Sequence, residues 1–304
     1  MDEAALLHEL EPVAGELLHR HLDMAKEWFP HEMVPYSRGK DFVVGEQWNS
    51  ADSDFGTASN DLADAVRASL FVNLLTEDNL PYYTRDISQL FGGDGAYGQW
   101  GRNWTAEEGR HSIVIRDYLT VTRAIDPIAL ERGRMQQVRG GQVPTPNDLY
   151  EALAYLSMQE LATRIAHRNT GKVMSDKVGQ AIMSRVGNDE NLHYLFYRDL
   201  ATAALAVDPS NMVIGIERAV RTFVMPGIGI PDFERLSREI ARAGIYDLAI
   251  HHDQILQPVV MRHWNITELT GLNSDAEKAR EALIKRIERI GKVAVRLTAD
   301  RVSA

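Results

Sequence analysis

One pattern of glutamates and histidines occurs twice in this chain and limits what the chain can fold into. In each copy, an isolated glutamate precedes a Glu-x-x-His element, and the spacing is nearly the same in both. Residues three apart lie on one face of a helix, so the Glu and His of each element can contact the same ligand. The copies comprise Glu77 with Glu108 and His111, and Glu160 with Glu190 and His193. The repeat predicts four helices that gather four carboxylates and two imidazoles.

Each piece of the pattern also has a simpler interpretation. Thr105 and Glu108 fit the S/T-x-x-E capping box, so Glu108 alone indicates a helix start, and an isolated Glu is most simply a surface carboxylate. However, Glu160 follows Leu156 on the apolar stripe of its helix, and Glu77 continues a similar stripe. A charge on a buried face is costly unless it is paired or coordinates a metal. Together, these carboxylates favour a metal site.

The pattern also predicts the fold class. One Glu from each of two helices and a Glu-x-x-His from each of two others form the ligand set of ferritin-like di-iron and di-manganese proteins. We therefore predict an all-α fold, a ferritin-like four-helix bundle with additional outer helices. The bundle helices are expected at 59–91, with a bend at Pro81, and at 105–124, 147–169 and 175–205. Outer helices are expected at 232–243, 247–263 and 274–298.

The chain is long enough for one large core. We expect a single domain over 1–304: an N-terminal helix and irregular cap in 1–56, the di-metal bundle in 57–205, and outer helices in 206–304. The 304 residues include no cysteine, which excludes thiolate ligands and disulfides. Oxygen and nitrogen ligands suit iron or manganese.

Charge and hydropathy limit the partners. The formal net charge of -10 argues against a general nucleic-acid surface. The acidic N-terminal segment lacks the basic start and apolar run of a secretory signal, and no apolar run approaches a membrane span. We expect a cytoplasmic protein without a membrane span.

Several longer motifs are similar to those of one enzyme family. They are TEDNLP at 76–81, WTAEEGRH at 104–111, QELATRIAHRNT at 159–170, DENLH at 189–193, GIY at 244–246 and LTGL at 269–272. These motifs resemble the soluble acyl-acyl carrier protein desaturases, and the chain looks most like their actinobacterial members. The resemblance implies a homodimer that uses O2 and two electrons from a ferredoxin-type donor. It also implies that a cis double bond is inserted into an acyl chain held on acyl carrier protein.

The resemblance assigns roles to individual residues. The six repeated residues match the ligands of two iron ions, with Glu108 and Glu190 bridging, although their spacing alone leaves manganese open. Thr163 matches a hydroxyl beside the oxygen-binding side of the metals. Trp28 and Asp189 match an electron path to His111. The acyl tunnel would be lined by Leu90, Ala152, Leu153 and Met225, although each of these also fits an ordinary core position.

Other expectations rest on physical chemistry. A ligating imidazole usually donates its second N–H to a carboxylate, and we expect Asp189 to accept from His111 and Glu107 from His193. Carrier protein is acidic, so Lys26, Arg221 and the basic cluster at 285–296 are candidate docking residues, although the cluster also fits a solvated helix face. Seven further histidines show no ligand spacing and are assigned no chemistry: His8, His19, His21, His167, His251, His252 and His263.

Two alternatives to desaturation stay open. A di-iron enzyme that abstracts hydrogen can also hydroxylate or otherwise oxidise the carrier-bound chain. A catalytically silent partner subunit is the second alternative, and loss of a ligand would have indicated it. The sequence leaves open the acyl chain length, the double-bond position and the pathway that the acyl group belongs to.

Overall fold

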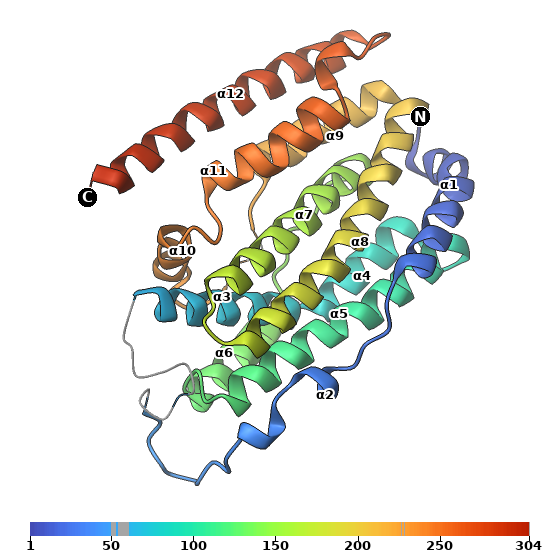
Figure 1. Cartoon of the computed structure of the whole chain (residues 1–304). Coiled ribbons are helices and arrows are strands. Elements are labelled where there is room, and N and C mark those ends of the chain that lie inside the picture. Colours follow the sequence, from blue (N-terminus) through green and yellow to red (C-terminus); the bar gives the residue numbers. More distant parts are fainter. Residues whose placement is uncertain (50–52, 54–60, 226, 228, 304) are drawn as a thin grey trace.

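Helices are the regular secondary structure of the described residues. The computed structural model of the chain describes residues 1–49, 53, 61–225, 227 and 229–303, and no strand occurs within them. Figure 1 shows long helices running side by side, with shorter ones around them. The predicted all-α class is confirmed.

Four helices form the bundle that the repeat predicts. They are α3 (Asp61–Glu77), α5 (Gly95–Val121), α7 (Leu149–Val173) and α8 (Lys177–Val207). The starts of α7 and α8 are fixed by caps, because Asp148 accepts from Glu151 N and Asp176 accepts from Val178 N and Gly179 N. A short connection joins α7 to α8, and the two helices pack along their length (Figure 1).

The first predicted bundle helix was wrong in one respect. Residues 59–91 were expected to form one long bent helix, and residues 59–60 lie outside the described residues. The structure instead has α3 and a separate helix α4 (Leu80–Phe91). Pro81 lies in the first turn of α4, where its missing N–H breaks no helical bond. Glu77 is therefore the last residue of α3 and does not lie near the middle of a long helix.

The second bundle helix begins at Gly95 and not near residue 105. Its extra turns bury Tyr97, Trp100 and Trp104 on one face, and this packing outweighs the poor helix propensity of the glycines there. The capping-box interpretation of Thr105 is wrong, because Thr105 lies inside the helix and its hydroxyl donates to Gly101 O at 2.6 Å.

Outer helices surround the bundle. Helix α1 (Glu3–Met24) packs on α5 and α8, α9 (Pro209–Thr222) on α7, α10 (Phe233–Arg242) on α3, and α12 (Ser274–Ser303) on α9. The predicted helix at 247–263 comprises α11 (Leu248–His251) and a π-helix (His252–His263) that contains Pro258. Helices α6 (Pro127–Gly140) and α9 were not predicted. The remaining elements are short: α2 (Pro30–Met33), η1 (Tyr36–Arg38) and η4 (Ile266–Glu268).

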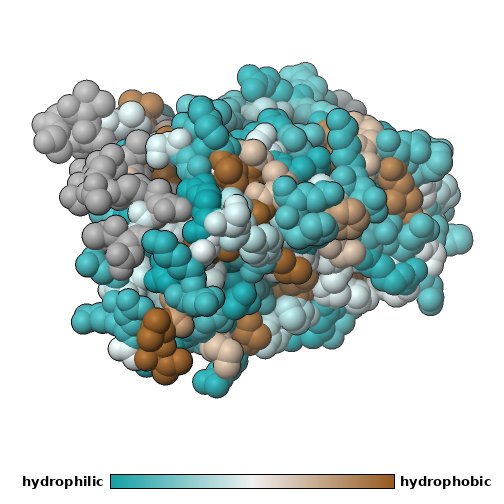
Figure 2. All heavy atoms as spheres, turned by 60° about the horizontal axis from the view of Figure 1, so that its bottom comes forward, coloured by the Kyte–Doolittle hydropathy of each residue, from teal (hydrophilic) through white to brown (hydrophobic). Residues whose placement is uncertain are grey.

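The bundle interior carries the main hydrophobic core, and the predicted ligands lie inside it. The face shown in Figure 2 is largely hydrophilic, and its hydrophobic side chains form small separate groups. Within the described part of the chain, no helix combines the length and hydrophobicity that a bilayer span requires.

Candidate metal centre

The structure brings the six repeated residues together in the middle of the bundle. Each of the four bundle helices contributes, α3 and α7 with one glutamate and α5 and α8 with a Glu-x-x-His pair. All six side chains are buried: Glu77, Glu108, His111, Glu160, Glu190 and His193. They form two groups whose ligand atoms lie within 4.8 Å of one another, and Glu108 and Glu190 belong to both.

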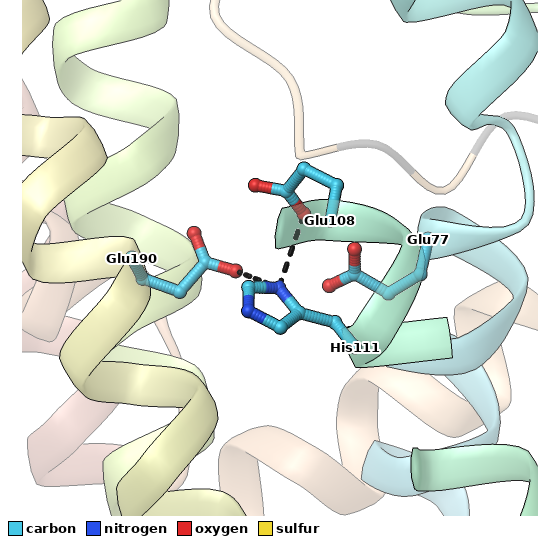
Figure 3. A group of neighbouring side chains, drawn as sticks. All are labelled: Glu77, Glu108, His111 and Glu190. Atoms are coloured by element: carbon cyan, nitrogen blue, oxygen red, sulfur yellow. Dashed lines mark hydrogen bonds and ion pairs between the residues drawn. The ribbon is translucent and has the colours of Figure 1, made fainter. Parts of the chain in front are cut away.

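The first group combines three carboxylates with one imidazole. His111 Nδ1 lies 3.1 Å from Glu108 Oε2 and 3.3 Å from Glu190 Oε1. Figure 3 shows the carboxyl groups of Glu77, Glu108 and Glu190 and the ring of His111 facing a common point. Four donor atoms from three helices therefore surround one position.

The second group is built in the same way around His193. His193 Nδ1 lies 2.9 Å from Glu108 Oε1 and 3.6 Å from Glu160 Oε2. The two oxygens of Glu108 thus face different histidines, Oε2 toward His111 and Oε1 toward His193. One carboxylate that faces two adjacent positions has the arrangement of a bridging ligand.

Two buried atoms at this centre show that a cation fits it. Glu108 Oε1 and His193 Nδ1 are only 2.9 Å apart, yet neither has a hydrogen-bond partner among the described residues. Burial and repulsion from Glu108 also raise the pKa of Glu77 to about 8, and burial raises the pKa of Glu160 well above its ordinary value. Bound cations would remove this repulsion, and the oxygen and nitrogen donors suit iron or manganese.

The outer nitrogens of both histidines face carboxylates, as we expected. His111 Nε2 lies 3.5 Å from Asp189 Oδ2, which also accepts a 2.7 Å hydrogen bond from Trp28 Nε1. His193 Nε2 donates to Glu107 Oε2 at 2.8 Å. Because the Nε2 atoms are engaged in this way, each ring is held with its Nδ1 toward the centre.

Two further donors hold the glutamates in place. The Thr163 hydroxyl donates to Glu190 Oε2 at 2.8 Å, so this predicted residue does contact the centre. Trp104 Nε1 donates to Glu160 Oε1 at 3.1 Å. Trp104 was noted only as part of a motif, and no sequence signal marks its indole as a partner of Glu160.

His167, to which no chemistry was assigned from its spacing, lies at the centre in the structure. Its buried Nε2 lies 3.4 Å from Glu77 Oε1 and 3.6 Å from Glu190 Oε1. Burial would lower its pKa, but hydrogen bonds and charge from Glu190 and Glu77 raise it to about 9. The seven-residue spacing from Glu160, which places both on one face of α7, was the available signal.

His21 is the second histidine that sequence analysis missed. Its Nε2 lies 3.1 and 3.2 Å from the two carboxylate oxygens of Glu107. These contacts join residues 86 positions apart in the chain, so local spacing carries no sign of them.

Two largely apolar cavities open beside the centre. The first holds about 670 Å³ of empty space, its mouth included, and extends from Glu77 and Glu108 past Leu80, Ile87 and Leu156. The second holds about 650 Å³ and lies between α3, α7 and α10. Both cavities are lined by the same three side chains at the centre: Thr76, Glu77 and Thr163.

The four predicted tunnel residues do not line one common cavity. Leu90 lines the first cavity and Met225 the second. Ala152 and Leu153 line neither and are fully buried in the core. Their positions match the simpler interpretation that they are core residues.

The fold and the buried carboxylate–histidine centre define a class, the ferritin-like helical-bundle proteins. A family model described as fatty acid desaturase matches residues 2–303. The chain belongs to this fatty acid desaturase family.

Individual relatives agree with this assignment. The chain is 42% identical, over 93% of its own length and 84% of the relative, to DesA1 of Mycobacterium tuberculosis, which is assigned by name to the acyl-[acyl-carrier-protein] desaturases. It is 28% identical to a palmitoyl-[acyl-carrier-protein] 4-desaturase of Ophrys sphegodes, over 96% of this chain and 76% of the relative. The X-ray structure of DesA2 of M. tuberculosis, assigned to the same enzymes, matches with a TM-score of 0.69 at 25% identity. That match covers 90% of this chain and 99% of the DesA2 chain.

Proposed function

We propose that this protein is an O2-dependent desaturase that inserts a cis double bond into an acyl chain carried on acyl carrier protein. Family membership and the names of the relatives support this activity. The observation that carries the proposal is the pair of ligand groups sharing Glu108 and Glu190, placed against an apolar cavity.

We further propose that the centre holds two iron ions. Glu77 and His111 would bind one ion, Glu160 and His193 the other, and Glu108 and Glu190 would bridge them. A bound metal pair supplies what side chains cannot, the activation of O2 to an oxidant that can break an unactivated C–H bond.

The overall reaction balances without other reagents. Two hydrogen atoms leave adjacent carbons of the chain as the double bond forms. These two hydrogens, two electrons from an external donor and two protons from solvent reduce one O2 to two waters.

The protein's part is to place the chain. The walls of the first cavity, including Ile87, Leu90 and Leu156, would hold an extended acyl chain and exclude water. Thr163 lines the same cavity and holds Glu190, so its hydroxyl would lie between chain and metals. Met225, in the second cavity, would contact the part of the chain on the other side of the centre.

Electrons would enter along Trp28, Asp189 and His111. The Trp28 and His111 rings stack with centroids 6.4 Å apart and planes at 14°. Arg110 and Arg185 lie over the Trp28 ring at 5.1 and 6.0 Å from its centroid. This stack connects the centre with the partly exposed guanidinium groups outside it.

Several expectations stay predictions: the ferredoxin-type donor, the homodimer, the cytoplasmic location, and docking of carrier protein at Lys26, Arg221 or the 285–296 cluster. We also propose that the chain works as one domain. In support, α9 packs on α7 of the bundle and α12 packs on α9.

The test is the mass of the acyl group after reaction. Iron-loaded protein is incubated with acyl carrier protein bearing chains from about C14 to about C24, with ferredoxin, its reductase, NADPH and O2. Loss of two hydrogens would support desaturation, and gain of an oxygen atom would favour the hydroxylase instead. An unchanged mass for every chain, with two reducible irons bound, would contradict desaturation of these chains and favour a specialised substrate or a silent partner subunit.

A further inference from the structure

The histidines of both Glu-x-x-His pairs are supported by the N-terminal segment of the chain. On one side, Trp28 donates to Asp189, which faces His111. On the other side, His21 contacts Glu107, which faces His193. His21 lies in the last turn of α1, and Trp28 lies seven residues later, just after the helix ends. We call each set of three groups a support. Both supports have the same order: a side chain from the N-terminal segment, a carboxylate and an imidazole of the centre.

The direction of the hydrogen bonds in the His21 support follows from chemistry. The Glu107 carboxylate lies within hydrogen-bond distance of two ring nitrogens, 2.8 Å from His193 Nε2 and 3.1 Å from His21 Nε2. An ionised carboxylate only accepts hydrogen bonds, so the Nε2 atoms of both His21 and His193 must donate to it. In the neutral ring that a metal ion binds, a proton on Nε2 leaves the lone pair on Nδ1, the nitrogen that lies 2.9 Å from Glu108 Oε1.

The position of the His21 ring is fixed by its surroundings. The side chain is 2% exposed. The ring meets Trp100 edge-on with centroids 5.0 Å apart, and it stacks on His193 with centroids 5.9 Å apart and planes at 23°. Its Nδ1 is buried and has no hydrogen-bond partner among the described residues. Among the described residues, Glu107 is therefore the one polar partner of this buried ring.

The two supports differ in how many donors hold the carboxylate. Asp189 accepts from Trp28 and also contacts the guanidinium groups of Arg185 and, at 3.5 Å, Arg110. Besides the two histidines, the one further donor near Glu107 in the described part of the chain is Arg110, at 3.8 Å. Loss of His21 would thus leave Glu107 with one firm donor, His193 itself.

We propose that His21 is a positioning residue for the metal centre. Through Glu107 it holds the His193 ring in the orientation and tautomer that direct Nδ1 to one of the two metal positions. The inference rests on the proposed function, because it assumes that the centre binds two metal ions. It assigns a role to α1, a helix outside the bundle, in binding one metal of the pair.

The test measures stepwise binding of Co2+ to the metal-free full-length protein by visible absorption, with stoichiometry from native mass spectrometry. Three variants are compared with the wild type. His21→Leu removes the donor, and His21→Gln keeps an N–H of similar reach. His19→Leu makes the matched change on an exposed residue of the same helix, whose side chain is 80% exposed. Far-UV circular dichroism checks that each variant is folded.

Partners that orient a metal ligand typically change metal affinity 10–100-fold. We expect His21→Leu to weaken one of the two Co2+ steps by roughly tenfold and leave the other within about twofold. His21→Gln should recover most of the loss, and His19→Leu should match the wild type.

Three results would overturn the role of His21: two unchanged Co2+ steps in folded His21→Leu, equal weakening of both steps, or no recovery in His21→Gln. Failure of the wild type to bind two Co2+ ions would instead contradict the proposed metal centre itself.

Discussion

Metal binding at this centre should depend steeply on pH. Burial and repulsion from Glu108 raise the pKa of Glu77 to about 8, so most Glu77 carboxyls are protonated at neutral pH in the metal-free protein. A carboxylate binds a metal ion in its ionised form, so binding at Glu77 displaces this proton. For one group with a pKa of about 8, the apparent metal affinity rises about 25-fold between about pH 6 and about pH 7.5. Burial also raises the pKa of Glu160, so 25-fold is a lower bound.

The assay is an anaerobic titration with Fe2+ in competition with a chromophoric chelator, at several pH values. Calorimetry in two buffers of different ionisation enthalpy counts the protons released. The raised pKa also affects the stability of the metal-free protein. Because the folded state binds more protons than the unfolded chain, the free energy of unfolding decreases as the pH rises toward 8. An affinity that is constant between about pH 6 and about pH 7.5, with two irons bound, would refute the reasoning.

Three further predictions concern other parts of the molecule. Gly215→Ala would place a Cβ 2.6 Å from the carbonyl carbon of Tyr150 and push α9 from α7. Urea unfolding should show a loss of about 1–3 kcal/mol, and wild-type stability would argue against this close approach. Burial, with the charge of His252, lowers the pKa of His251 to about 4. The unfolded chain therefore binds a proton at His251 before the folded protein does, so the free energy of unfolding decreases as the pH falls from about 6.5 toward 4. We compare the unfolding free energy of the wild type with that of His251→Phe. The difference between them should decrease by about 2 kcal/mol from about pH 7.5 to about pH 5. A difference that stays constant would show that His251 titrates normally. Leu156→Trp should fill part of the first cavity and lower kcat/KM for the longest acyl chains by about tenfold or more, with both irons retained. An unchanged chain-length profile would place the acyl chain elsewhere.

The sequence predicts the centre of this molecule better than its periphery. Glu77 and Glu160 stand on apolar helix stripes, where an unpaired charge is costly, so their burial together was foreseeable. The two Glu-x-x-His pairs lie on strongly periodic helices, and such periodicity is the most reliable sequence signal. Their convergence in two groups follows from these two features.

Other features depend on contacts that local patterns do not contain. Helix α5 begins in a glycine-rich stretch whose low helix propensity hid it, and only the burial of Trp100 and Trp104 against the core explains its length. His21 meets Glu107 across 86 residues, so no spacing rule identifies it. Helix α9 is different, because Asp208 caps it and Pro209 opens it. That start signal was present in the sequence and was missed.

The most direct test of the account is the position of iron in crystals of the iron-loaded protein, measured by anomalous scattering at the iron absorption edge. We predict two adjacent peaks inside the bundle, one next to His111 Nδ1 and one next to His193 Nδ1, with Glu108 and Glu190 in contact with both. A single peak, or iron bound away from these residues, would contradict the proposed centre.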